Sequence, residues 1–142
     1  LDIGCGKGFL LYDFTKVVPG ISIYGIDISD YAIKNNKKEI SKHLVQGNAN
    51  KLPWPDNYFD LVISINTLHC LHSYDLFDSL KEMERVGKEN KYLCVESYKN
   101  EEEKANLLYW QVTCEAFNNP DSWRWWFSHS GYKGDYSFIY FD

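Results

Sequence analysis

Residues 1–8 of the chain read LDIGCGKG, and this stretch decides the fold. A short apolar segment, residues 1–3, runs directly into a turn that contains Gly4, Gly6 and Gly8. Glycine lets a backbone turn sharply, and it lets a ligand approach where a Cβ would block it. The stretch therefore predicts a strand, a ligand-binding turn and the start of a helix.

The rest of the chain alternates between runs typical of strands and segments with helical periodicity. The expected strands are residues 21–27, 43–47, 59–65, 91–97 and 136–141, and the expected helices are residues 9–18, 29–40, 73–86, 100–117 and 123–130. Ser29 and Asn100 are predicted caps, Ser73 or Asp75 caps the third helix, and Asp121 or Ser122 caps the last one.

Alternating strands and helices imply βαβ units and a parallel sheet that is covered by helices on both faces. We therefore expect an α/β fold with three αβα layers and a Rossmann-like sheet of about six or seven strands. The sheet should be mostly parallel, with the C-terminal strand, residues 136–141, antiparallel at one edge. The 142 residues are expected to form a single domain, in which residues 1–98 are the ligand-binding core and residues 99–142 add the last helices and strand.

Composition excludes several classes of partner. The net charge of −5 argues against nonspecific binding to nucleic acid or to an anionic membrane, because both need a basic face. The chain has no apolar run near the ~18 residues of a membrane span. Its four cysteines form no C-x-x-C pair, which is typical of reduced thiols in a cytoplasmic protein.

Two motifs resemble one known family. LDIGCGKG fits the pattern D/E-x-G-x-G-x-G, the first motif of the class I S-adenosylmethionine (SAM)-dependent methyltransferases. Residues 52–71, LPWPDNYFDLVISINTLHCL, resemble the LPF-x-D-x-x-FD-x-V segment of the small-molecule group often called type 11. Together the matches cover residues 1–98. The resemblance implies SAM as the methyl donor and a small molecule as the acceptor.

In an open α/β sheet, ligands lie beyond the carboxyl ends of the strands. Asp27 follows the second expected strand, and its carboxylate can accept hydrogen bonds from both hydroxyls of a ribose. The resemblance places Asn48 at the adenine, where the family usually has aspartate; the amide oxygen of Asn48 can still accept a bond from the adenine amino group. The expected cofactor-binding residues are Asp2, Gly4, Cys5, Gly6, Gly8, Asp27, Ile28, Asn48, Ala49 and Asn66.

Three further residues are candidate catalytic groups because they follow the fourth and fifth expected strands. A base at His69 or His72 could take a proton from an oxygen or nitrogen nucleophile of the acceptor, and Tyr98 is a similar candidate. Packing at the start of a helix is the competing interpretation of both histidines. The sequence HCLH is an incomplete ligand set, so we expect no metal site.

Three alternatives stay open. The chain could bind SAM without catalysis, or it could be a nicotinamide-dependent oxidoreductase, although the G-x-G-x-G spacing counts against the second. A methyltransferase acting on a macromolecule is disfavoured by NTLH, which stands where the amino-methylating DNA enzymes carry an N-P-P-Y type motif. A homodimer also stays open. The family resemblance implies a helical segment ahead of the first strand, and we expect this chain to lack it and to have an open donor site.

Overall fold

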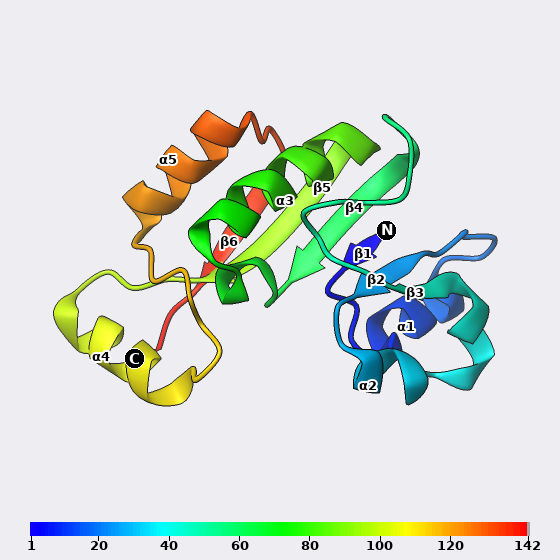
Figure 1. The fold of residues 1–142 in the computed structure, drawn as a ribbon, viewed down its shortest axis with the longest axis horizontal. Helices are drawn as coiled ribbons and strands as arrows, with labels where there is room; N and C mark the ends of the chain where they lie inside the picture. The colour runs from blue at the N-terminus through cyan, green and yellow to red at the C-terminus, as the bar shows by residue number, and fades with distance from the viewer. Residues whose placement is uncertain (142) are drawn as a thin grey trace.

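The computed structural model describes residues 1–141, which form a six-stranded sheet with helices on both sides (Figure 1). The strands are β1 (Asp2–Ile3), β2 (Gly25–Asp27), β3 (Leu44–Gln46), β4 (Phe59–Ile65), β5 (Gly87–Glu96) and β6 (Asp135–Ile139). The α-helices are α1 (Phe9–Val17), α2 (Asp30–Lys34), α3 (Ser73–Val86), α4 (Glu101–Trp110) and α5 (Pro120–Ser130). Two 3₁₀ helices, η1 (Lys38–His43) and η2 (Leu68–Cys70), complete the set.

The strand order is β3-β2-β1-β4-β5-β6, and every neighbouring pair is parallel. From β1 the chain first builds outward through β2 and β3, and it then returns to the other side of β1 to build β4, β5 and β6. The order therefore reverses between β1 and β4. In an open parallel sheet, this reversal opens a crevice at the carboxyl ends of the two strands. The expected α/β Rossmann-like fold is confirmed.

The direction of the last strand differs from the expectation. β6 is parallel to β5, with Leu93 opposite Tyr136 and Glu96 opposite Ile139, so the predicted antiparallel edge strand is wrong. The reason is the path of α5, which packs beside α3 and carries the chain back along the sheet (Figure 1). The strand that follows it therefore starts at the same end of the sheet as β5.

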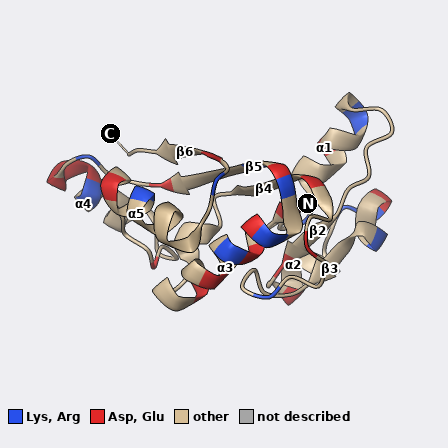
Figure 2. Cartoon of the chain, turned by 90° about the horizontal axis from the view of Figure 1, so that it is seen from above, with Lys and Arg blue, Asp and Glu red and all other residues tan. Residues whose placement is uncertain are grey.

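Helices lie on both faces of the sheet. Seen along the sheet, α3 and α5 lie on one side of β4, β5 and β6, and α1 lies on the other side (Figure 2). Leu76, Leu80 and Met83 of α3 are fully buried, and their spacing places them on one face of that helix. They pack in the main core together with Val62 of β4 and Trp123 of α5. Of the helices in residues 1–141, none has both the length and the apolar character needed to cross a bilayer.

The predicted caps hold at two helices. The Ser29 hydroxyl accepts a hydrogen bond from the backbone N–H of Ala32 at the start of α2, and the Asn100 side chain accepts one from Glu103 at the start of α4. The helix expected over residues 29–40 ends at Lys34, and a separate 3₁₀ turn follows it.

The other two predicted caps are wrong. α3 begins at Ser73 itself, so neither Ser73 nor Asp75 caps it, and the residue before it is His72. α5 begins at Pro120, and the side chain of Asn119 caps it by accepting a hydrogen bond from the N–H of Ser122. A proline at the first helical position leaves one fewer N–H to satisfy there, which explains the earlier start. The helix expected to reach residue 117 ends at Trp110.

Candidate functional site

The glycine turn is fastened to the neighbouring strand. Gly4, Gly6 and Gly8 have φ values of +79°, +53° and +81°, in the left-handed region that glycine adopts without a Cβ penalty. The backbone N–H groups of Gly4 and Cys5 both donate to the carbonyl oxygen of Ile26, at 2.8 and 3.1 Å. The turn is therefore held in one conformation at the carboxyl ends of β1 and β2.

The three glycines differ in what surrounds them. A Cβ placed on Gly4 would lie 2.0 Å from Oγ1 of Thr67, and one on Gly8 would lie 2.7 Å from Cδ1 of Leu44. A Cβ on Gly6 would meet nothing within 4 Å. Protein packing therefore explains the first and third glycines. The space beside Gly6 is open, so this position leaves room for a ligand to approach the backbone.

Asp27 joins the turn to the start of α2. Its Oδ2 accepts a 2.7 Å hydrogen bond from the N–H of Gly6, and its Oδ1 accepts a 2.8 Å bond from the N–H of Ser29. A carboxylate has about four acceptor positions, so two stay available to a ligand. The next residue, Ile28, is 66% exposed although it is apolar. The end of β2 thus offers an acceptor pair beside an exposed apolar surface.

Asn48 and Ala49 lie next to this strand end. The N–H of Gly47 donates to the carbonyl oxygen of Asp27 at 3.0 Å, so the chain leaving β3 is tied to the end of β2. Oδ1 of Asn48 accepts a 3.2 Å hydrogen bond from the N–H of Asn50. Ala49 packs against the main core. The amide oxygen of Asn48 is therefore oriented by its own loop.

Asn66 ends β4 in an unusual conformation. Its φ of +54° lies in the left-handed region, and within residues 1–141 only one other non-glycine residue, Asn57, has a positive φ. The N–H of Asn66 donates to the carbonyl oxygen of Cys94 on β5 at 3.0 Å. Backbone held in such a conformation occurs preferentially at ligand sites. β4 lies next to β1 in the sheet, so Asn66 borders the same crevice as the glycine turn.

Burial controls the charges beneath the turn. Asp2 is nearly fully buried, and burial raises its pKa to about 6. Burial, with added repulsion from Asp2 and Asp27, raises the pKa of the Cys5 thiol to about 12. Cys5 is therefore a protonated thiol at neutral pH, and its contribution to the site is its backbone.

His69 is fully buried and faces β5. Its Nδ1 accepts a 3.3 Å hydrogen bond from the N–H of Glu96, which leaves the proton on Nε2, 3.3 Å from Oε2 of the same residue. The carbonyl oxygen of His69 accepts hydrogen bonds from the N–H groups of Glu115 and Ala116. Burial lowers the pKa of His69 to about 4, so the ring is neutral at pH 7. Through its carbonyl oxygen, His69 therefore fixes the segment between α4 and α5, and its role in these contacts is structural.

The other two candidate catalytic residues are more accessible. The His72 side chain is 58% exposed, its Nδ1 lies 3.6 Å from Oε2 of Glu115, and its ring stacks on Tyr74. Tyr98 is half-buried after β5, with Nζ of Lys104 lying 5.3 Å from the centre of its ring. Both residues follow strands at the carboxyl edge of the sheet, where the glycine turn also lies.

Residues of α3 that contact the loop after β3 are a part of the site that the motifs did not predict. Asp75, Glu82 and Arg85 bond to residues within 50–56, in the same loop as Asn48. The i, i+3 spacing of Glu82 and Arg85 is a visible signal of an ion pair on the helix. The i, i+3 spacing does not, however, indicate that these two residues contact a loop distant in the sequence.

A hollow of about 520 Å³ lies elsewhere in the molecule. Leu11 and Phe14 of α1 line it on one side, and Tyr24, Phe59 and Leu61 line it on the other. These residues belong to α1 and to the parts of the sheet remote from the carboxyl ends of β1 and β2. The hollow is therefore separate from the glycine turn.

Comparison with known proteins agrees with this geometry. A family model described as a methyltransferase domain matches residues 1–136. The mitochondrial arginine-hydroxylase NDUFAF5 of Rattus norvegicus is 36% identical over 89 residues, which are 62% of this chain and 25% of the relative. The demethylmenaquinone methyltransferase of Anoxybacillus flavithermus is 34% identical over 105 residues, which are 68% of this chain and 44% of the relative.

The fold is also similar to solved structures. A SAM-dependent methyltransferase from Archaeoglobus fulgidus superposes with a TM-score of 0.71 at 24% identity, covering 92% of this chain and 58% of that one. The chain spans less than half the length of the two curated relatives named above. The family match covers nearly all of the chain and fits the glycine turn at the reversal of the strand order. The chain therefore belongs to the methyltransferase domain family, as its two sequence motifs predicted.

Proposed function

We propose that this chain binds SAM at the glycine turn and transfers its methyl group to a small-molecule acceptor. The observation that carries the proposal is the environment of Gly6. Its N–H is fixed by Asp27, and the side of its Cα that a side chain would occupy opens on empty space. A Cβ on Gly20 or Gly131 would also meet nothing within 4 Å, so the open space counts only together with the place of Gly6 beside Asp27, at the carboxyl ends of β1 and β2.

The residues around the turn fit the parts of SAM. The two free acceptor positions of Asp27 suit the ribose hydroxyls, exposed Ile28 suits one face of the adenine, and Oδ1 of Asn48 suits its amino group. The backbone of Gly6 and Asn66 borders the methionine end. When bound, SAM supplies a methyl group on a positively charged sulfur, and the protein's task is to align the acceptor with it and exclude water.

Of the two candidate histidines, His72 is the better base for the acceptor. Its ring is exposed, so an acceptor can reach it. His69 is fully buried, its Nδ1 accepts a hydrogen bond from the N–H of Glu96, and its Nε2 lies 3.3 Å from Oε2 of the same residue. Tyr98 is the second candidate for contact with the acceptor. An acceptor that is already nucleophilic needs no base, so methyl transfer does not depend on either residue.

A second function is favoured by one relative. The rat protein that is 36% identical over 89 residues is named an arginine-hydroxylase, so a similar stretch also occurs in a protein named for other chemistry. The second candidate is therefore a protein that binds SAM without transferring its methyl group.

One experiment separates the two functions. The protein is incubated with a small-molecule extract and SAM that carries a deuterated methyl group, and the products are searched for the mass of one added labelled methyl. A labelled product that forms with the protein, and fails to form with its Gly6→Ala variant, supports methyl transfer. Binding of SAM without any labelled product supports the second candidate.

A further inference from the structure

One face of α3 contacts the loop that carries Asn48. This loop, residues 47–58, links β3 to β4 without helix or strand. Asp75, Glu82 and Arg85 are separated by seven and three residues, so they lie along one side of the helix. Asp75 bonds to Asn50, whereas Glu82 and Arg85 both bond to Leu52.

Arg85 secures the far end of the loop. Its Nη1 donates to the carbonyl oxygen of Trp54 and to Oδ1 of Asp56, both at 2.8 Å, and its Nη2 donates to the carbonyl oxygen of Leu52 at 3.2 Å. The guanidinium is itself held by Glu82, whose carboxylate accepts bonds of 2.6 and 2.8 Å from it. Glu82 also accepts a 2.7 Å bond from the N–H of Leu52. Bidentate pairs of this kind fix direction as well as distance.

Asp75 secures the end of the loop nearest the site. Its Oδ1 accepts a hydrogen bond from the side-chain amide of Asn50. The backbone N–H of Asn50 in turn donates to Oδ1 of Asn48. Two successive bonds therefore connect α3 to the amide oxygen that faces the adenine in the proposed function. The second lone pair of that oxygen is left for a ligand.

We propose that α3 positions Asn48 for adenine, so that Asp75 sets the affinity and base preference for SAM without touching it. This inference rests on the proposed function, because it assigns a role toward the same ligand. An irregular loop loses conformational freedom when it must be ordered on binding, and a loop already ordered avoids that cost. Asp75, with Asn50, is therefore a positioning residue for the donor.

The test uses a pair of ligands that differ only at the base. S-Adenosylhomocysteine carries an amino group that donates to Asn48, and S-inosylhomocysteine carries an oxygen that cannot donate. The wild-type chain should prefer the adenine compound by roughly fivefold, the worth of about one hydrogen bond. The Asp75→Ala variant should lose most of this preference, whereas Asp75→Asn, which keeps an acceptor oxygen, should retain it.

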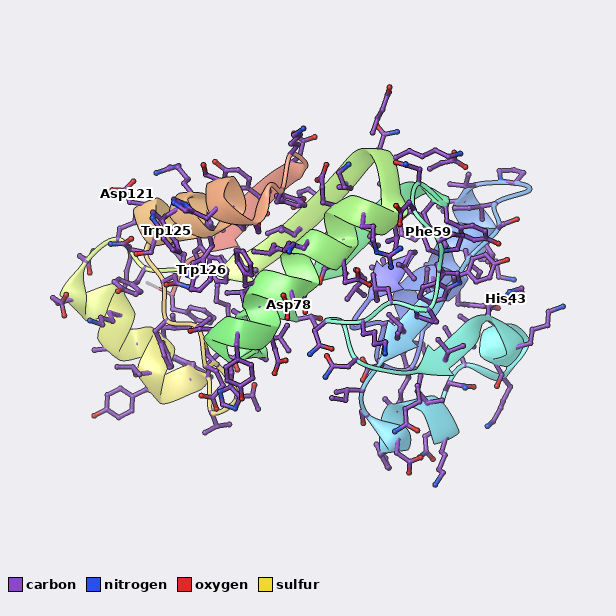
Figure 3. All side chains as sticks on the ribbon, turned by 45° about the horizontal axis from the view of Figure 1, so that its top comes forward. His43, Phe59, Asp78, Asp121, Trp125 and Trp126 are labelled. Carbon is purple, nitrogen blue, oxygen red and sulfur yellow. The ribbon has the colours of Figure 1, made fainter. Side chains whose placement is uncertain are left out.

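Two further variants control the measurement. Asp78→Ala removes an exposed carboxylate from the same helix (Figure 3), and it should leave both affinities unchanged. Asn50→Ala removes the other partner of the Asp75 bond from the loop side, so it tests the same bond if Asp75→Ala fails to fold. The double variant should lose no more preference than either single one, because both remove one interaction.

The outcomes are distinguishable. A folded wild-type chain that binds neither compound overturns the proposed function and this inference with it. A wild-type chain that binds both equally leaves the proposed function standing and overturns the positioning of Asn48. A preference that persists unchanged in folded Asp75→Ala or Asn50→Ala overturns the role of α3 alone.

Discussion

The backbone N–H of Gly6 donates a 2.7 Å hydrogen bond to Oδ2 of Asp27. The two residues come from different strand ends, and the bond fixes the turn against the carboxylate that the proposed function assigns to the ribose. Asp27 therefore has two tasks. It orders the turn and the start of α2 in the free protein, and in the proposed function its remaining lone pairs accept hydrogen bonds from the ribose.

Replacing Asp27 with alanine should weaken binding of S-adenosylhomocysteine by roughly 1.5–3 kcal/mol, the cost of losing charge-assisted hydrogen bonds. The variant should also unfold at a lower temperature, because the N–H groups of Gly6 and Ser29 lose their acceptor. Calorimetric titration and thermal unfolding measure the two effects. Asp30→Ala is the control, since Asp30 pairs with Lys34 in an exposed i, i+4 contact. Unchanged affinity in Asp27→Ala would show that Asp27 is a turn residue only.

Comparing Gly6→Ala with Gly20→Ala should separate the effect of backbone strain on stability from the effect of an added methyl group on SAM binding. Both glycines have a positive φ, and an added Cβ at either position meets nothing within 4 Å. Each substitution should cost about 1–2 kcal/mol of stability, because an L-residue is strained in the left-handed region. Only Gly6→Ala should also abolish binding of SAM, since its methyl group enters the space assigned to the ligand. Equal SAM affinities in the two variants, measured by calorimetry on folded samples, would argue against that assignment.

His69 should make the fold sensitive to acid. Burial lowers its pKa to about 4, from 6.5 in the unfolded chain. Between these values the unfolded chain binds the proton and the folded chain does not, so this residue lowers stability as pH falls. At about 1.4 kcal/mol per pKa unit, the loss between pH 7 and pH 4 is roughly 3 kcal/mol. Burial raises the pKa of Asp2 and of Glu96, which act in the opposite sense.

The comparison that isolates His69 is therefore between wild type and His69→Asn. Asparagine can accept the bond from the N–H of Glu96, but it does not titrate. The free energy of unfolding from urea titrations should fall less between pH 7 and pH 4 in the variant than in the wild type. Parallel curves for the two proteins would mean that His69 is accessible to protons in the folded state.

Local patterns predicted the elements that carry a strong apolar signal in the sequence. β4 spans residues 59–65 as expected, because a continuous run of apolar and β-branched residues is typical of a strand inside a parallel sheet. The direction of β6 was beyond such patterns. Residues 136–141 read as a strand in either direction, and the choice depends on where α5 returns the chain to the sheet.

The position of a candidate residue in the fold was predictable where the residue lies at the end of a strand or just after it. Asp27, Asn48 and Asn66 lie at the carboxyl edge of the sheet because parallel strands bring their ends together. Contacts between distant segments could not be predicted. His69 has the same sequence context whether it faces an acceptor or the core, and its burial against Glu96 depends on packing between η2 and β5. The contact between Arg85 and Trp54 is equally nonlocal.

The most direct test of the account is calorimetric titration of the folded chain with SAM, S-adenosylhomocysteine and NADH in parallel. The geometry of Gly6, Asp27 and Asn48 predicts saturable binding of the first two ligands at a one-to-one ratio, with micromolar-range affinity. The G-x-G-x-G spacing of the turn predicts no binding of NADH. A folded sample that binds NADH, or that gives no saturable heat with SAM and with S-adenosylhomocysteine, would contradict the assignment of this turn as a SAM site.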